Sequence, residues 1–160
     1  MGWFSSAFNS VRPGLAPLRE SSKPPDHPWI TSHRAGVLHI VFPAEAKDGD
    51  LERFCSELGA FWQRAQGTVG LLIDCRKVRV TSSEQRRMLI EFRKRTAPLV
   101  AQKVSCGAYL ADSALQRGLL SAILLVRPPS YPYRTFPEPS SALRWLDERM
   151  GTTGRTVPPS

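Results

Sequence analysis

The sequence predicts an α/β fold in which a single mixed, largely parallel β-sheet packs with about four α-helices. Short apolar runs alternate along the chain with longer segments whose apolar residues recur at helical spacing. The run VGLLIDC, at residues 69–75, has the continuous apolar character of a central parallel strand that is buried on both faces. A glycine between two extended stretches near residue 36 predicts a hairpin, which would add antiparallel pairing at one side of the sheet.

The folded domain is expected to cover residues 27–150, with a tail on either side. The chain has 160 residues, which is enough for one domain with its own hydrophobic core. Residues 1–26 are rich in proline and serine, so we expect a flexible N-terminal tail, although the apolar residues near its start have the spacing of a short amphipathic helix. Residues 151–160 are rich in glycine, threonine and proline, which predicts a disordered C-terminal tail.

The first half of the domain is expected to hold the hairpin and one helix. Residues 29–32 and 37–42 are the two expected strands of the hairpin. A helix then runs to about residue 66, and Asp48 or Asp50 could act as its N-cap. Its apolar face has helical spacing and contains Leu51, Phe54, Cys55, Leu58, Trp62 and Ala65.

The second half is expected to alternate strands and helices. After the central strand, Ser82 or Ser83 could cap a helix that runs to about residue 102, and Pro98 is expected to kink or shorten it. The later elements are a strand at residues 104–111, a helix capped by Asp112 and built on the apolar residues 115–126, a short strand at 133–136, and a helix at 141–150 capped by Ser140. This order implies right-handed crossovers between parallel strands.

Composition limits the class of protein. Cys55, Cys75 and Cys106 lie far apart in apolar surroundings, which predicts reduced core thiols and neither a disulfide framework nor a zinc site. No secretory signal or membrane-spanning run is visible, so a cytoplasmic protein is expected. The net charge of +8 and the pI near 10.0 favour an anionic partner, although a basic surface also serves solubility alone.

Four sequence features carry a resemblance to a known family. They are the order of the elements, the run LLIDCRKV followed by TSSEQRR, the segment RPPSYPYRTF, and the closing SSALRWLDE. On these features, residues 36–150 resemble the STAS family of anti-sigma-factor antagonists, and more remotely the lipid-transfer domains of the CRAL-TRIO type. The resemblance implies a single-domain bacterial protein of SpoIIAA-like fold that regulates a partner and is not an enzyme.

In that family a kinase phosphorylates a serine at the start of the helix after the central strand. The matching position here is Ser83, which the resemblance makes a candidate phosphorylation site. The aspartate that precedes this serine in the family motif and the glycine that follows it are both absent from this sequence.

The start of the same helix is the most favoured binding surface, because ligands and partners of parallel sheets gather where strands end and helices begin. Backbone N–H groups and nearby basic side chains there could hold an anion or a protein partner. The candidate residues are Arg76, Lys77, Arg79, Ser82, Ser83, Arg86 and Arg87. No aromatic residues are interleaved with this basic cluster, so a protein partner is expected rather than nucleic acid.

Catalysis is not expected. The three histidines have no spaced carboxylate or cysteine partner, and no phosphate-binding or metal-binding motif is present, so neither a cofactor nor a metal is expected. Asp74, at the end of the central strand, is the one acid worth inspecting, and capping of the following turn would explain it equally well.

The main hypothesis is therefore a non-catalytic regulatory module that binds a protein partner. One alternative is a carrier or sensor of a small apolar or anionic, lipid-like ligand, because the apolar helix at 115–126 and the segment at 128–136 could flank a pocket. Another is a peripheral membrane adaptor, in which Trp3, Phe4 and Phe8 dock on a membrane or on a partner. The sequence leaves the oligomeric state open.

Overall fold

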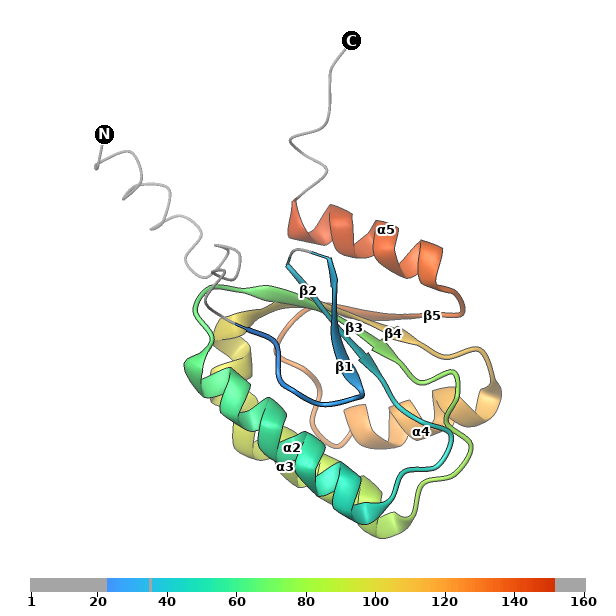
Figure 1. The fold of residues 1–160 in the computed structure, drawn as a ribbon. Coiled ribbons are helices and arrows are strands. Elements are labelled where there is room, and N and C mark those ends of the chain that lie inside the picture. The colour runs from blue at the N-terminus through green and yellow to red at the C-terminus, as the bar shows by residue number, and fades with distance from the viewer. Residues whose placement is uncertain (1–22, 35, 152–160) are drawn as a thin grey trace, which may run out of the picture.

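Five strands and four helices form in residues 23–34 and 36–151, the part of the chain that this computed structural model describes (Figure 1). In chain order they are β1 (Ile30–Arg34), β2 (Val37–Val41), α2 (Asp48–Arg64), β3 (Val69–Asp74), α3 (Ser83–Lys103), β4 (Val104–Leu110), α4 (Ala114–Leu124), β5 (Tyr133–Phe136) and α5 (Pro139–Met150). The predicted α/β class is confirmed. The proposed docking residues Trp3, Phe4 and Phe8, and most of both predicted tails, lie outside the described residues.

The sheet is mixed, and its spatial order follows the chain order β1-β2-β3-β4-β5. The strands β1 and β2 form the expected antiparallel hairpin, and every later neighbour pairs in parallel. β3 is the central strand, with His39 of β2 on one side of Leu72 and Ala108 of β4 on the other. Central position explains why residues 69–72 and 74 are buried, as their apolar run predicted.

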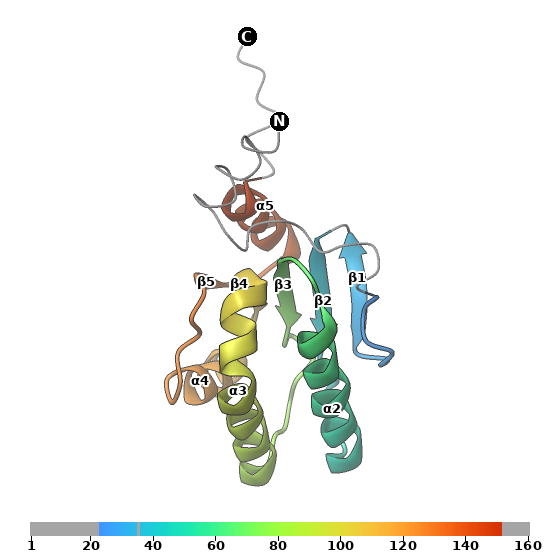
Figure 2. The ribbon, with the colours of Figure 1, turned by 90° about the vertical axis from the view of Figure 1, so that its left-hand side faces the viewer.

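Sequential strand order determines where the helices lie. A right-handed crossover puts its helix on a fixed side of the sheet, and three crossovers that advance in the same direction put all three helices on the same side. Figure 2 shows α2, α3 and α4 below one face and α5 on the opposite face. The helix α5 covers the second face through Ala142 and Leu146, which are fully buried against β3, β4 and β5.

The core on the three-helix face is divided. One cluster joins α2 and α3 to β1, β2 and β3, and its largest fully buried side chains are Phe54, Phe61 and Trp62 of α2. A second cluster joins Leu120 and Leu124 of α4 to the sheet. α3 packs much more extensively on α2 than on α4. The two clusters are therefore not packed tightly against each other.

Three helix boundaries differ from the predictions. Asp48 and Asp50 do not cap α2 but lie in its first turn, where their charges favour the helix dipole. Ser113, and not Asp112, caps α4, because its hydroxyl accepts the Gln116 backbone N–H at 3.2 Å. The last helix begins at Pro139 instead of residue 141, since proline suits the first turn of a helix.

Pro98 does not shorten α3, which continues to Lys103. A proline inside a helix removes one N–H donor and leaves the carbonyl group four residues earlier without its usual partner. Pro98 is exposed, so this unpaired carbonyl lies on the solvent side of the helix, where water can bond to it. None of the described helices has the length and apolarity needed to span a membrane.

Candidate functional site

The predicted basic loop begins with an ion pair. The Asp74 carboxylate accepts hydrogen bonds from the Arg76 backbone N–H at 3.0 Å, from its Nε at 2.9 Å and from its Nη2 at 2.7 Å. Burial opposes the ionisation of Asp74, but the hydrogen bonds and charge of Arg76 outweigh it and lower the pKa of the carboxyl group. Asp74 therefore stabilises the turn after β3, and Arg76 uses its Nε and Nη2 for this ion pair.

Ser82 caps α3 as predicted. Its hydroxyl accepts the Gln85 backbone N–H at 3.0 Å, and the Gln85 side chain accepts the Ser82 backbone N–H at 3.3 Å, which makes a capping box. The Gln85 amide also donates to the Ala46 carbonyl and to the Asp48 carboxylate, both at 2.8 Å. The start of α3 is thereby attached to the loop before α2.

The remaining basic residues of the loop divide into two kinds. Arg86 is half-buried and holds the helix start, because it donates to the Thr81 carbonyl at 2.8 Å. Lys77, Arg79 and Arg87 are exposed, and neither of the two ion pairs within the described part of the chain involves them. Of the basic side chains in the predicted surface, these three are the most accessible to a partner.

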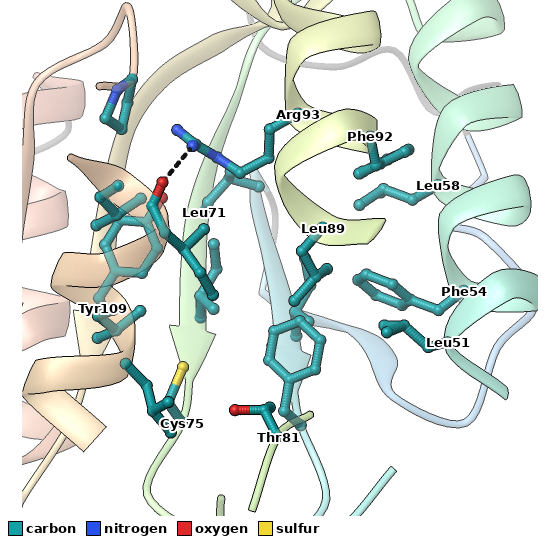
Figure 3. A pocket seen from close by; sticks show the side chains of 18 of the residues that line it. Leu51, Phe54, Leu58, Leu71, Cys75, Thr81, Leu89, Phe92, Arg93 and Tyr109 are labelled. Carbon is teal, nitrogen blue, oxygen red and sulfur yellow. Dashed lines mark hydrogen bonds between the residues drawn. The ribbon is translucent and has the colours of Figure 1, made fainter. Parts of the chain in front are cut away.

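A deep cavity lies beside this loop, on the three-helix face of the sheet. It has a volume of about 330 Å³ and opens between α3 and α4, with the sheet as its floor (Figure 3). The apolar side chains that line it include Ile40, Leu58, Leu71, Ile73, Leu89, Phe92, Val100, Leu119, Leu120 and Ile123. The segment 127–131 forms a further part of the wall. A pocket flanked by helix 115–126 and segment 128–136, as the sequence indicated, agrees with this position.

Incomplete packing between α3 and α4 explains the cavity. Ile73 is in the central strand of a five-stranded sheet, yet it is only half-buried, because its side chain lies at the floor of the cavity. At one end Gln116 holds α4 on the preceding loop, with its amide donating to the Arg76 carbonyl at 2.6 Å and its side-chain oxygen accepting the Asp112 N–H at 2.9 Å. The end of α4 is thereby positioned by polar bonds to the loop and not by close contact with α3.

Few polar groups face the cavity. Tyr109 of β4 is buried, and its hydroxyl lies 2.7 Å from the Tyr131 hydroxyl. Arg93 of α3 donates from Nη1 to the Ile123 carbonyl at 3.3 Å, and Figure 3 shows it pointing across the pocket toward the side where Tyr109 lies. The Thr81 hydroxyl, elsewhere in the lining, is buried without a hydrogen-bond partner in the described structure.

The cavity holds no recognisable catalytic group. None of the three histidines lines it, and its one cysteine, Cys75, has a pKa that burial raises to about 12. Cys55 and Cys106 are buried free thiols, as predicted, and burial raises their pKa values too. No group of three or more potential metal ligands occurs within residues 23–34 and 36–151.

No protein-family model matches the chain, and no curated protein matches it at a significant level. Its structure is similar to the crystal structure of an uncharacterized DUF3478-family protein from Shewanella loihica PV-4, which is described as having a SpoIIAA-like fold. The TM-score is 0.57 at 16% sequence identity, over 73% of this chain and 91% of that one. This chain has a SpoIIAA-like fold. The STAS-like fold predicted from the sequence is therefore confirmed.

Within the SpoIIAA-like fold, Ser83 lies at the first residue of the helix that follows the central strand. It is exposed, and its hydroxyl accepts a hydrogen bond from Arg86 Nη2 at 3.3 Å. Phosphorylation of Ser83 stays a prediction.

Sequence reasoning did not single out Arg93, Tyr109 or Tyr131. Arg93 belongs to a helix whose polar face is rich in basic residues, and no local pattern distinguishes it from its neighbours. Tyr131 follows two prolines in a segment that was expected to flank a pocket, but no residue within that segment was singled out. The buried glutamines did leave a signal, since Ser82 to Gln85 and Ser113 to Gln116 both have the S-x-x-Q spacing of a capping box.

Proposed function

We propose that this protein is a non-catalytic module of STAS type that binds a small apolar molecule in the pocket between α3 and α4. The cavity of about 330 Å³ is the observation that carries this proposal. Ligand sites are typically concave, largely apolar, and supplied with a few polar groups. The pocket has all three properties, whereas the loop after β3 uses most of its polar groups to hold its own structure.

A packing argument supports the proposal. Protein interiors are close-packed, and empty apolar cavities of this size cost stability because their lining loses dispersion contacts. Leu89, Val100, Leu119 and Ile123 are only half-buried although they line one space on the inner face of the domain. An apolar ligand would complete the packing of these side chains, which α3 and α4 do not achieve alone.

The proposal can be tested with N-phenyl-1-naphthylamine, a neutral probe whose fluorescence rises in apolar surroundings. The full-length protein is expected to bind it saturably. Ile123→Trp places an indole ring from α4 in the cavity and should remove most of the affinity. Leu115→Trp is the matched control, because Leu115 is on the same helix but 54% exposed, and it should leave binding unchanged.

Absence of saturable probe binding to the wild-type protein would refute the proposal. Equal binding by both tryptophan variants would also refute it, since the probe would then occupy another surface. Circular dichroism of each variant would establish that the fold is retained.

A second candidate function is the docking of a protein partner on the exposed basic residues of the loop after β3. Lys77, Arg79 and Arg87 support it, because they are exposed and their charges are not used in an ion pair within the described structure. Such a surface would fit an acidic partner, and its affinity would fall as salt increases.

Affinity purification from the protein's own cells can test the second candidate. Arg79→Ala/Arg87→Ala should lose a partner that the wild type retains. Arg117→Ala/Arg144→Ala removes the same charge from other exposed positions and should retain that partner. A partner lost equally from both double variants would indicate a response to net charge and would contradict docking on this loop.

A further inference from the structure

The polar groups around Arg93 include unused donors and no negatively charged acceptor, and this limits what the pocket can bind. A guanidinium has five N–H donors and no acceptor. Arg93 uses one of them for the Ile123 carbonyl, and neither of the two ion pairs in the described part of the chain involves it. Its positive charge therefore has no carboxylate partner within residues 23–34 and 36–151, although the side chain is half-buried.

The tyrosine pair adds another donor. Two hydroxyl groups contain two hydrogen atoms, and the bond of 2.7 Å between Tyr109 and Tyr131 uses only one of them. No further hydrogen bond from either hydroxyl occurs in the described structure, so one O–H remains to donate. Burial raises the pKa of both tyrosines, which keeps them protonated near neutral pH, so neither supplies the anion that Arg93 lacks.

The three groups line the same pocket, and Figure 3 shows Arg93 pointing toward the side where Tyr109 lies. The charge of Arg93 is felt by both hydroxyl groups, where it opposes the effect of burial on their pKa values. The pocket lining contains no aspartate or glutamate, and its second charged residue is another arginine, Arg127, which is exposed. The missing component at this end of the pocket is an acceptor with negative charge.

We infer that the ligand of this pocket is a small amphipathic carboxylate, with its carboxylate held by Arg93 and the Tyr109–Tyr131 hydroxyl pair and its apolar part between α3 and α4. This inference rests on the proposed function, because it names the chemical class of the molecule that the pocket takes.

Charge selects a carboxylate over a phosphate monoester. A planar guanidinium matches the two oxygens of a carboxylate, and one half-buried arginine offsets a single negative charge. A phosphate monoester carries up to two charges near neutral pH, and the second would be desolvated without a partner. The cavity of about 330 Å³ lies within the range of small-molecule pockets, about 300–1,000 Å³, so it suits a small ligand.

Displacement of N-phenyl-1-naphthylamine by three ligands of equal chain length tests the inference on the full-length protein. The ligands are decanoate, decanol and decylamine. We expect the wild type to bind decanoate roughly tenfold or more tightly than decanol, which is the effect of a charge-assisted hydrogen bond, and to bind decylamine most weakly.

Variants identify the residues that make the difference. Arg93→Gln should lose the preference for decanoate and keep the affinity for decanol, whereas Lys94→Gln, at an exposed position of the same helix, should change neither affinity. Tyr131→Phe should reduce the preference by a smaller factor, because one hydroxyl group of the pair remains. Decanol binding depends on the apolar pocket and not on the charge of Arg93. A variant that only loosens the packing of α3 against α4 would therefore reduce the affinity for decanoate and for decanol equally.

The two proposals fail in different ways. Equal displacement by decanoate and decanol in the wild type, or an unchanged decanoate preference in Arg93→Gln, would overturn the inference and leave the apolar pocket as proposed. If none of the three ligands displaces a probe that does bind, the inference is also overturned. No saturable binding of the probe would overturn the proposed function, and the inference with it.

Discussion

Gly107 gives the sharpest test of how the pocket wall is built. An alanine methyl group at this position of β4 would lie 2.6 Å from Cε1 of Tyr131, and 3.4 Å from its Cδ1 and Cζ. Carbon atoms pack favourably at about 3.5–4.0 Å, so Gly107→Ala must push the ring away by about 1 Å. The ring cannot yield freely, because its hydroxyl is hydrogen-bonded to Tyr109.

The expected cost of Gly107→Ala is about 2 kcal/mol in the free energy of unfolding. Overpacking costs about 1–3 kcal/mol, and loss of the bond between the tyrosine hydroxyls adds about 1 kcal/mol. Replacing a strand glycine by alanine stabilises the fold by about 0.5–1 kcal/mol, because alanine loses less backbone entropy on folding. For a domain of this size the net change corresponds to a decrease of about 6–10 °C in the melting temperature.

A double-mutant cycle measured by urea unfolding isolates the contact between Gly107 and Tyr131. In a Tyr131→Ala background the same glycine substitution should stabilise the protein by about 0.5–1 kcal/mol, since the ring that it strikes is gone and only the gain in backbone entropy remains. Gly118→Ala in α4 is the control, because nothing lies within 4 Å of its added methyl group and the change should stabilise the helix by up to about 1 kcal/mol. An equal cost of Gly107→Ala in both backgrounds would refute the steric explanation.

Three further predictions concern the turn after β3, the cap of α3 and the thiols. Asp74→Asn should cost about 2 kcal/mol, because it replaces the charged acceptor of Arg76. Folding lowers the pKa of Asp74, so its contribution to stability is lost only when the carboxyl group is protonated. In urea unfolding at different pH values, the difference in the free energy of unfolding between Asp74→Asn and wild type should be constant between pH 5 and 8 and shrink as pH falls below about 4. A difference that grows at low pH would contradict this. Ser82→Ala should cost about 1 kcal/mol and the exposed Ser83→Ala less than about 0.5 kcal/mol, and a reversed order would show that Ser82 is not the effective cap. Cys75 should react with iodoacetamide only in denaturant, since its thiol is buried and has a pKa raised to about 12, and rapid alkylation of the native protein, located by mass spectrometry, would disprove it.

The elements of this fold were predictable because their signals are local and strong. The apolar run at 69–75 and the glycine near residue 36 gave the central strand and the hairpin within a residue or two. Caps were less predictable, because several adjacent polar residues can serve equally well. Asp112 and Ser113 both suit the N-cap of α4, and the geometry of the preceding strand end, which the sequence does not contain, decides for Ser113.

The site was less predictable than the fold. The sequence indicated that residues 115–126 and 128–136 could flank a pocket, and the cavity is there, but its polar end is assembled from Arg93, Tyr109 and Tyr131 on three separate segments. No spacing rule connects an arginine in a helix, a tyrosine in a strand and a tyrosine after two prolines. Their proximity follows only from the way α3 and β4 are arranged in space.

Strand order explains why the pocket is not at the usual place for a parallel sheet. Ligands of open α/β sheets bind where the strand order reverses, because helices then leave on opposite faces and open a crevice at the ends of the strands. Here the order never reverses, so all three crossover helices lie on one face. Any space must then form between neighbouring helices, and it forms where α3 and α4 are least closely packed.

The loop after β3 takes part in both candidate functions, but different side chains of the loop serve each one. Val78 and Thr81 line the pocket, whereas Lys77 and Arg79 are exposed to solvent. The residues of this loop that would contact a ligand are therefore not the residues that would contact a partner. A substitution at Arg79 removes charge without reaching the cavity, and Ile123→Trp fills the cavity without changing the loop's charge, so each function can be abolished while the other is measured.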